Sequence, residues 1–376
     1  MSADLALWAR VARTPGLHAD AIRALLDQEP DLRSLERGKR AALTAVGWPG
    51  SLVDAYLAID NDTIAEDTRF LSRNNCLLIP CCDPAYPPQL LELRRAPAVL
   101  FVRGDAAVLR HPQLAMVGSR NPTAGGRSTA REFAQYFARA GLAITSGLAL
   151  GIDAACHEGA LAADGLTVAV CAHGLDQLYP RENAGLGEKI VLQGGALVSE
   201  FAPGVPPLKA HFPQRNRIIA GLALGTLVVE AARESGSLIT ARHAGEAGRD
   251  VFAIPGSIHN PLARGCHRLI RQGAKLVETA ADVLSELPFS LQKQLATGDT
   301  PTAKGAAATP PSLDNDYKIL LDALAFEPVT VDTLVERTEF PSESVASMLL
   351  ILELEGQVQP HPGGRYSRSQ PRSERK

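Results

Sequence analysis

Short apolar runs alternate with amphipathic stretches over the middle of the chain, between residues 74 and 287. Continuous apolar runs of this length are typical of parallel strands that are covered on both faces. Their alternation with helical stretches predicts an α/β fold, an extended Rossmann-like doubly wound parallel sheet, whose ligands bind beyond the carboxyl ends of the strands. The predicted strands are 114–117, 143–145, 167–171, 196–199, 226–229, 251–254 and 275–277, and the predicted helices include 126–140, 152–163, 237–248 and 264–272.

The N-terminal flank, residues 1–72, has a different pattern. Amphipathic stretches at 5–12, 19–28 and 52–59 and a GKRAAL segment are separated by turns that contain Pro and Gly. This pattern predicts a small all-α domain of the SAM or helix-hairpin-helix type. Such a domain either offers backbone amides to DNA phosphate or only packs as a cap, and the sequence leaves both open. We expect the sheet domain to cover residues 73–288.

The C-terminal flank contains three further segments. Residues 289–312 are rich in Ala, Thr and Pro, so we expect a flexible linker. Residues 313–368 contain three helical patterns followed by glycine turns, an order that resembles a winged helix. The third pattern, 342–353, has core spacing but no Lys or Arg on its other face, so we expect protein contacts, or weak DNA contact through the wing. Residues 369–376 form a basic tail.

The composition limits the function classes. The chain of 376 residues has a formal net charge of −3, so a nucleic-acid site must come from local clustering of cations. No charged N-terminal segment precedes an apolar run, and no stretch reaches about 18 apolar residues, which predicts a cytoplasmic protein with no membrane contact. The six cysteines lack zinc-binding spacing, so we expect reduced thiols and no metal site.

The first informative strand end is the Gly118-Ser119-Arg120 turn. A small residue lets the backbone approach an anion, the following helix supplies free amides, and Arg120 adds a guanidinium suited to phosphate. A GxGxxG motif and a complete P-loop are both absent, so we expect no nucleotide cofactor.

The second strand end places Ser146, Gly147 and Gly151 before a helix. Asp153 and His157 follow at i and i+4, a spacing that fits either an acid/base pair or a structural role. We favour the structural role, with Asp153 in the first helical turn, because no nucleophile or ligand set accompanies the pair. We therefore expect no catalytic residue here.

A third feature is the basic loop around residues 203–221. No acidic residue lies between Glu200 and Glu230. Cations that follow a backbone, together with an aromatic side chain for base stacking, are what a single-strand site needs. The candidates are Lys209, Phe212, Arg215, Asn216 and Arg217.

The fourth strand end carries Glu230, and Ser235-Gly236-Ser237 then opens a helix whose amides face the same edge. Glu230 is either a catalytic base or an anchor for the backbone amides of a neighbouring loop. We favour the anchor, since the chain contains no GxSxG, HExxH or paired acidic motif.

These strand ends occur in an order that resembles the DNA processing protein A family, DprA/Smf. The resemblance implies single-stranded DNA binding, a homodimer, and loading of RecA during natural transformation. It assigns the phosphate-gripping arginine to Arg120 and the basic and aromatic run to residues 209–217. We expect Leu269, Ile270 and Leu276 to contribute to the dimer contact. The motifs that carry the resemblance are VGSRNPTAGG, TSGLALGIDAACHEGAL, FPQRNRIIAGLA, VVEAARESGSLITARHA, VFAIPGS and GCHRLIRQGA.

Two alternatives remain open from the sequence. Residues 221–230 keep the Gly-Thr and Glu of the nucleoside-monophosphate phosphoribohydrolase signature but lack its Pro-Gly-Gly. A nucleotide-processing enzyme is therefore the main rival. A regulatory adaptor that works through the winged helix is the third hypothesis.

Overall fold

The protein forms two compact units, Met1–Thr300 and Pro301–Lys376. They are seen here in a computed structural model. Among the described residues, no helix is long and apolar enough to cross a bilayer, and no group of three His, Cys, Asp or Glu residues could hold a metal ion. The structure describes residues 2–29, 32, 35, 40–287, 317, 320–321, 323–324, 329–338, 340–354, 357–361 and 364–368.

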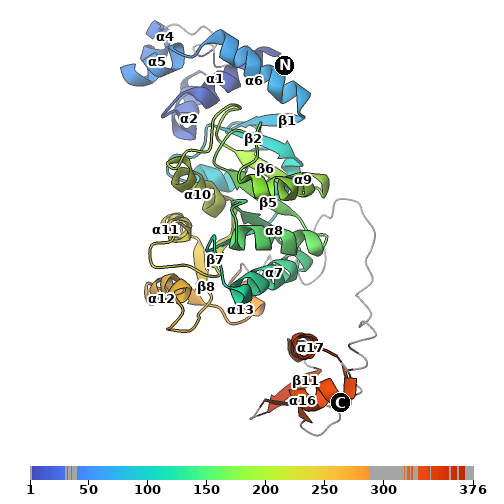
Figure 1. Ribbon diagram of the computed structural model, residues 1–376. Coiled ribbons are helices and arrows are strands. Elements are labelled where there is room, and N and C mark those ends of the chain that lie inside the picture. Colours follow the sequence, from blue (N-terminus) through green and yellow to red (C-terminus); the bar gives the residue numbers. More distant parts are fainter. Residues whose placement is uncertain are drawn as a thin grey trace, which may run out of the picture. The chain divides into compact units, whose positions relative to one another are not determined.

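A nine-stranded sheet organises the first unit (Figure 1). Its order is β1-β2-β6-β5-β4-β3-β7-β8-β9, and the seven strands from β6 to β9 in this order are parallel. All seven predicted strands are present, and the Rossmann-like α/β prediction is confirmed. The strands are β3 (Gln113–Val117), β4 (Ala143–Ser146), β5 (Thr167–Cys171), β6 (Ala196–Ser199), β7 (Gly225–Val228), β8 (Asp250–Ala253) and β9 (Lys275–Leu276).

Two further strands, which the sequence analysis did not predict, extend the sheet beyond β6. They are β1 (Cys76–Pro80) and β2 (Val99–Gly104). β2 pairs antiparallel with β6, and β1 pairs antiparallel with β2. The sheet is therefore parallel in its main part and antiparallel at one side.

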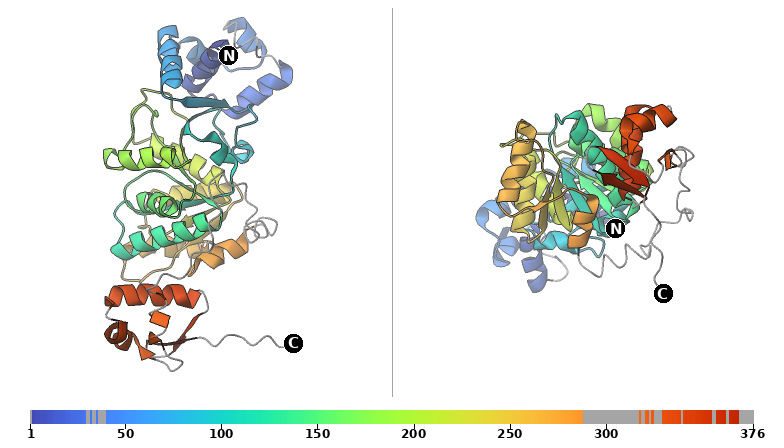
Figure 2. Two further views of the ribbon diagram at one scale, coloured as in Figure 1. Left: turned by 90° about the vertical axis from the view of Figure 1, so that its right-hand side faces the viewer. Right: turned by 90° about the horizontal axis from the view of Figure 1, so that it is seen from below.

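Alternate side chains of each strand enter different cores. On β3, Leu114 and Met116 belong to the core formed with α7 and α8, whereas Ala115 and Val117 belong to the core formed with α10, α11 and α12. Figure 1 shows the two helix layers, and in the turned view of Figure 2 α7 and α8 lie in front of the sheet. The helices are α7 (Ala124–Arg139), α8 (Ile152–Ala162), α9 (Ala184–Leu192), α10 (His211–Leu222), α11 (Ser237–Glu246), α12 (Arg264–Arg271) and α13 (Ala280–Glu286), and the 3-10 turns are η1 (Pro88–Glu92), η2 (Ala106–Arg110), η3 (Arg181–Asn183) and η4 (Pro261–Ala263).

The strand order reverses between β3 and β7. The chain runs from β3 through α7 to β4, and from β7 through α11 to β8, so the two connections leave toward opposite faces of the sheet. This arrangement opens a crevice outside the carboxyl ends of the two central strands, which is where ligands of doubly wound proteins bind.

The N-terminal helices share a core with the sheet. Ile22 and Leu25 belong to the same buried cluster as residues of β2 and α10. Arg13 pairs with the buried Asp67 at 2.5 Å and donates to the carbonyl of Pro203 at 2.7 Å. The described part of residues 2–73 is thus docked on the sheet within one compact unit. Their helices are α1 (Ser2–Arg13), α2 (Ala19–Gln28), α4 (Arg40–Ala45), α5 (Gly50–Leu57) and α6 (Asn61–Arg73).

The described part of the second unit includes a three-stranded sheet and the helices α16 and α17, around a core that contains Leu334, Val345 and Leu352. Of the three helical patterns predicted in residues 313–368, the second and the third are present, at 331–338 and 342–354. The predicted linker, 289–312, and the predicted tail, 369–376, lie outside the described residues. The elements are β10 (Val329–Thr330), α16 (Val331–Thr338), α17 (Ser342–Leu354), β11 (Val358–His361) and β12 (Arg365–Arg368).

Replacing Phe137 with Ala tests the core between α7 and the sheet. Phe137 is fully buried, so we expect the Phe137→Ala variant to lose about 3 to 5 kcal/mol of unfolding free energy in urea denaturation followed by circular dichroism. As a control, Leu192→Ala, at a side chain that is 83% exposed, should change it by less than about 0.5 kcal/mol. If both substitutions changed the free energy of unfolding equally, Phe137 would not be part of a core between α7 and the sheet.

Candidate nucleic-acid interface

A cavity of about 890 Å³ lies at the carboxyl ends of β3 and β7, and we call it the sheet-edge cavity. Segments that are distant in the sequence meet there, as the sequence analysis predicts. They are the turn after β3, the first turns of α10 and the turn that opens α11. The predicted residues that line it are Gly118, Ser119, Arg120, Asp153, Lys209, Phe212, Arg215, Asn216, Ser235, Gly236 and Ser237.

The aromatic ring of Phe212 lies among cations. The guanidinium carbon of Arg120 is 5.3 Å from the ring centroid and that of Arg215 is 6.0 Å from it. Tyr179 contacts the same ring edge-on, with centroids 6.1 Å apart, and is itself 47% exposed. Arg120 and Lys209 are exposed. The cavity therefore combines accessible cations with two accessible aromatic rings, of which the sequence analysis identified only Phe212.

Arg215 is not an exposed phosphate ligand but a buried link between loops. Its side chain is 4% exposed and donates to the carbonyls of Gly147, at 2.7 Å, and Val170. Burial lowers the pKa of Arg215, and the nearby carboxylate of Asp153 opposes that effect. A Cβ at Gly147 would lie 2.6 Å from the guanidinium nitrogens, so only glycine fits there.

Asp153 anchors the loop after β4. Its carboxylate accepts hydrogen bonds from the backbone amides of Gly147, at 3.1 Å, and Ala149, at 3.4 Å. Burial raises the pKa of Asp153, and the positive charge of Arg215 opposes the shift. This is the structural role that the sequence analysis favours.

Three predicted residues of this loop shape it rather than line the cavity. Ser146 is buried and donates to the carbonyl of Met116 at 2.7 Å, which ties β4 to β3. Gly151 has φ +83°, and a Cβ there would lie 2.4 Å from the carbonyl oxygen of Ser119. Gly147 faces Arg215, as described above. Their backbone positions hold the turn after β3 in place.

Glu230 anchors the glycine-rich turn that opens α7. Its carboxylate accepts from the amide of Thr123, at 2.9 Å, and from the Thr123 hydroxyl, at 2.6 Å. The backbone carbonyl of Glu230 accepts from the amide of Ser119 at 2.7 Å. A Cβ at Gly126 would lie 2.3 Å from this carboxyl group. Glu230 therefore anchors this turn, which is the role that we favour over that of a catalytic base.

The prediction that Arg217 grips DNA beside Arg120 is corrected by the structure. Residues 211–222 form helix α10 rather than a loop, with Pro213 in the first turn, where its missing amide costs no hydrogen bond. Successive residues rotate by about 100° in a helix, so Phe212 and Asn216 share one face and Arg217 lies on another. Arg217 is buried, pairs with Glu200 and lines a different cavity.

The three residues expected at a dimer contact lie in different environments. Leu269 is buried in the core, so its prediction as a surface contact is wrong. Ile270 is partly buried against the same core, and Leu276 is 48% exposed on the edge strand β9. Beside it, Lys275 pairs with Asp250 at 2.9 Å and Glu286 at 2.7 Å.

His157 has a structural partner and does not pair with Asp153. Its Nδ1 lies 2.7 Å from the hydroxyl of Thr167, which itself donates to the carbonyl of Ile144 at 2.6 Å. The hydroxyl therefore accepts from His157, and the imidazole is neutral with its proton on Nδ1. Burial lowers the pKa of His157 to about 3, and the charge of Arg215 acts in the same direction.

The fold and the sheet-edge cavity define a Rossmann-like protein with a crevice at the strand-order reversal that exposed cations and aromatic rings line. Residues 77–288 match the family described as DNA recombination-mediator protein A, and residues 304–364 match the DprA winged helix domain. The chain belongs to the DNA recombination-mediator protein A family, which makes it a DNA-processing recombination mediator.

Relatives of known name cover most of the chain. Protein Smf of Escherichia coli K12 is 39% identical over 361 residues, which are 96% of this chain and 95% of the relative. DNA processing protein DprA of Streptococcus pneumoniae R6 is 44% identical over 252 residues, which are 67% of this chain and 87% of the relative.

Two solved structures are similar as well. The X-ray structure of DprA from Streptococcus pneumoniae matches with a TM-score of 0.63 and 39% identity, covering 74% of this chain and 96% of that one. DNA processing protein A from Helicobacter pylori, whose structure is described for its single-stranded DNA binding mode, matches with a TM-score of 0.52 and 26% identity, covering 58% of this chain and 99% of that one.

His157 should make stability depend on pH. The folded state holds the imidazole neutral down to pH about 3, whereas the unfolded chain protonates it near the ordinary histidine pKa of 6.5. The contribution of His157 to the free energy of unfolding is therefore complete above pH 6.5 and is lost as the pH falls toward 3. The loss approaches about 1.4 kcal/mol per pH unit for one proton. We expect the His157→Gln variant, measured by urea unfolding between pH 7 and 5, to lose less stability than the wild type. Parallel pH dependences of the two proteins would contradict this assignment.

Proposed function

We propose that this protein binds single-stranded DNA in the sheet-edge cavity and passes the strand to the recombinase RecA. The observation that carries the proposal is the contact between Arg120 and Phe212, which places an exposed cation and an accessible ring side by side. Sequence-tolerant single-strand sites combine these two groups, because a ring can stack only on a base that is not paired within a duplex.

The roles of the residues follow from their exposure. Arg120 and Lys209 are exposed and contact phosphates, and Phe212 stacks on a base. The N-terminus of α11 adds the positive end of the helix dipole at the same edge. Asn216 donates to the carbonyl of Gly236 at 3.3 Å, which fixes the turn that opens α11 next to α10.

The relatives support the same function. The structure of the Helicobacter pylori relative is described for its single-stranded DNA binding mode, and the matching family is described as a recombination mediator. They support binding of a single strand and a role in recombination, and delivery of that strand to RecA, with natural transformation as the setting, is the step that we propose beyond them. We further propose a homodimer, with Leu276 and Ile270 near the contact, because two linked cavities raise the effective concentration on one strand.

The phosphoribohydrolase alternative has no support from the geometry. Gly221, which begins the related signature, lies inside α10, where a Cβ would meet the side chains of Leu93 and Leu90 at 2.5 and 2.9 Å. The segment therefore does not form a glycine loop around a phosphate. The carboxylate of Glu230, the catalytic group in that signature, is bonded to Thr123 instead.

Substitutions in the sheet-edge cavity test the DNA site. We expect Phe212→Ala to weaken binding of an oligo-dT by about 1 to 3 kcal/mol, from the lost stacking. Arg120→Ala and Lys209→Ala should each weaken binding and reduce the slope of log K against log salt by about 0.7 for each lost phosphate contact. Fluorescence anisotropy at several salt concentrations measures both quantities.

The control is Arg139→Gln, at an exposed arginine near the end of α7 that is not among the residues lining the cavity. It should leave affinity and slope unchanged. If Arg120→Ala and Lys209→Ala also leave both unchanged, the sheet-edge cavity is not the DNA site.

A RecA assay tests the second step. On single-stranded DNA already covered by a single-strand-binding protein, the wild type should speed RecA filament formation, as followed by RecA ATP hydrolysis. Arg120→Ala should lose this stimulation, because it cannot hold the strand, whereas Arg139→Gln should retain it. Stimulation by Arg120→Ala equal to that of the wild type would separate RecA loading from the cavity.

A further inference from the structure

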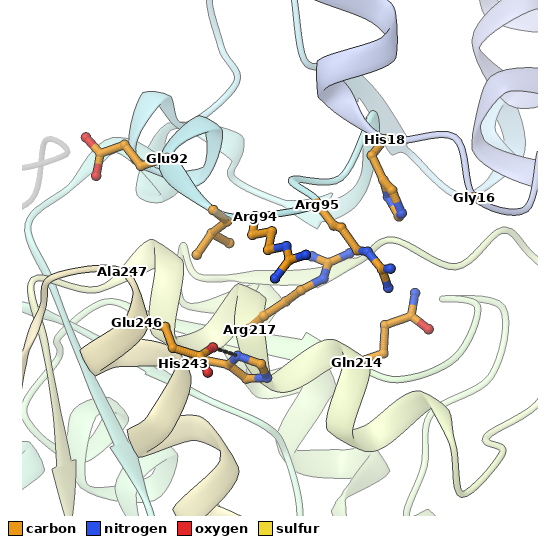
Figure 3. A pocket seen from close by; sticks show the side chains of 11 residues that line it. Gly16, His18, Glu92, Arg94, Arg95, Gln214, Arg217, His243, Glu246 and Ala247 are labelled. Atoms are coloured by element: carbon orange, nitrogen blue, oxygen red, sulfur yellow. Dashed lines mark hydrogen bonds and ion pairs between the residues drawn. The ribbon is translucent and has the colours of Figure 1, made fainter. Parts of the chain in front are cut away.

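A second cavity, of about 670 Å³, lies where the N-terminal helices meet the sheet domain (Figure 3). Three arginines and two histidines, His18 and His243, line it, and we call this cavity the arginine pocket. His18 comes from the start of α2, Arg94 and Arg95 follow η1, and Arg217 comes from α10 on a different side from Phe212. None of the roles described above uses this cavity.

Arg217 is the buried element of the pocket. Arg217 is 7% exposed, and its side chain points into the space between Arg94, Arg95 and Gln214 (Figure 3). One guanidinium nitrogen pairs with Glu200, but Nη1 is buried and has no hydrogen-bond partner among the residues that the structure describes. Buried N–H groups are nearly always bonded, so this nitrogen points to a ligand or water with acceptor oxygens.

Arg94 and Arg95 add accessible positive charge. Both are exposed, and within the described part of the chain no ion pair involves either of them. Figure 3 shows their side chains directed toward the same space as Arg217. Arg95 has φ +64°, a left-handed backbone that is uncommon for a residue with a side chain and that holds it in this turn.

The acidic residues of the pocket already have partners. Glu92 pairs with Arg249 at 2.8 Å, and Glu246 lies 3.1 Å from the ring of His243, the contact dashed in Figure 3. Burial lowers the pKa of His18, and the charges of Arg217 and Arg95 lower it further. The space between the arginines is therefore electropositive.

We propose that the arginine pocket binds the di- or triphosphate group of a small molecule. Guanidinium forks match phosphate oxygens, and an anion placed among three of them would relieve their mutual repulsion and satisfy Nη1 of Arg217. The lining residues include no Phe, Tyr or Trp, so the pocket lacks the stacking surface of a single-strand site. The proposal is independent of DNA binding in the sheet-edge cavity.

The test is a titration with inorganic triphosphate at constant ionic strength, followed by calorimetry and by the thermal midpoint of unfolding. The protein titrated is Arg120→Ala/Lys209→Ala, so that cations of the sheet-edge cavity do not contribute. We expect saturable binding and a raised midpoint. Adding Arg94→Gln/Arg95→Gln should weaken binding at least tenfold. These two residues are exposed, so the variant should fold.

A charge-matched control carries Arg69→Gln/Arg139→Gln, at exposed arginines of α6 and α7 that do not line the pocket. It should bind triphosphate as the parent does. A third variant, Arg217→Lys, keeps a positive charge for Glu200 but loses the fork, and should bind several-fold more weakly.

Three results would overturn the proposal. The first is no saturable binding of triphosphate by the parent, and the second is an equal loss in the charge-matched control. The third concerns the source of the phosphate. If Arg94→Gln/Arg95→Gln, made in the wild type, weakens oligo-dT binding tenfold but leaves triphosphate binding unchanged, the pocket holds strand phosphates and not a small ligand.

Discussion

One buried guanidinium holds the working edge of the sheet together. Arg215 bonds the carbonyls of Gly147, after β4, and Val170, on β5, while Asp153 supplies the opposing charge and binds the amides of the same loop. A buried charge is tolerated only when it is paired and hydrogen-bonded, so these groups depend on one another. The loop after β4 in turn supports the turn that carries Arg120, through the hydrogen bond from the amide of Ile152 to the carbonyl of Ser119.

This arrangement separates the groups that build the edge from the groups that can reach a ligand. Asp153, Glu230 and Arg215 satisfy backbone amides, hydroxyls and carbonyls. The accessible groups are Arg120 and Lys209, with Phe212 between cations. A site of this kind is preorganised, because the loops that present the cations are fixed before any polyanion arrives.

Much of the fold could be predicted from the sequence, because seven strands are continuous apolar runs and parallel strand ends must meet at one edge. The strands β1 and β2 were missed, since the chain joins them without a regular α-helix and the alternation that reveals the other strands is lost there. Convergence of Arg120, Phe212 and the turn opening α11 followed from topology alone. Such reasoning places residues at an edge but does not say which way a side chain points.

The direction in which a side chain points depends on local backbone geometry, which the sequence pattern did not reveal. The run HFPQRNR, predicted as part of a loop, begins α10 with Pro213 in its first turn, so the helical period directs Arg217 away from Phe212. Charge is equally uninformative about burial: Arg215 and Arg217 look like surface cations in the sequence and are both buried. Tyr179 was missed because it follows β5 in a segment with no cluster of cations to mark it.

The outermost strand on the β8 side, β9, has only two residues, and Lys275 within it is held by two carboxylates. Short strands that carry a charge are poor templates for addition of a foreign strand, so this open border of the molecule resists aggregation. Two copies that meet near Leu276 would consequently associate through side-chain packing and not through a ladder continued from one chain into the next.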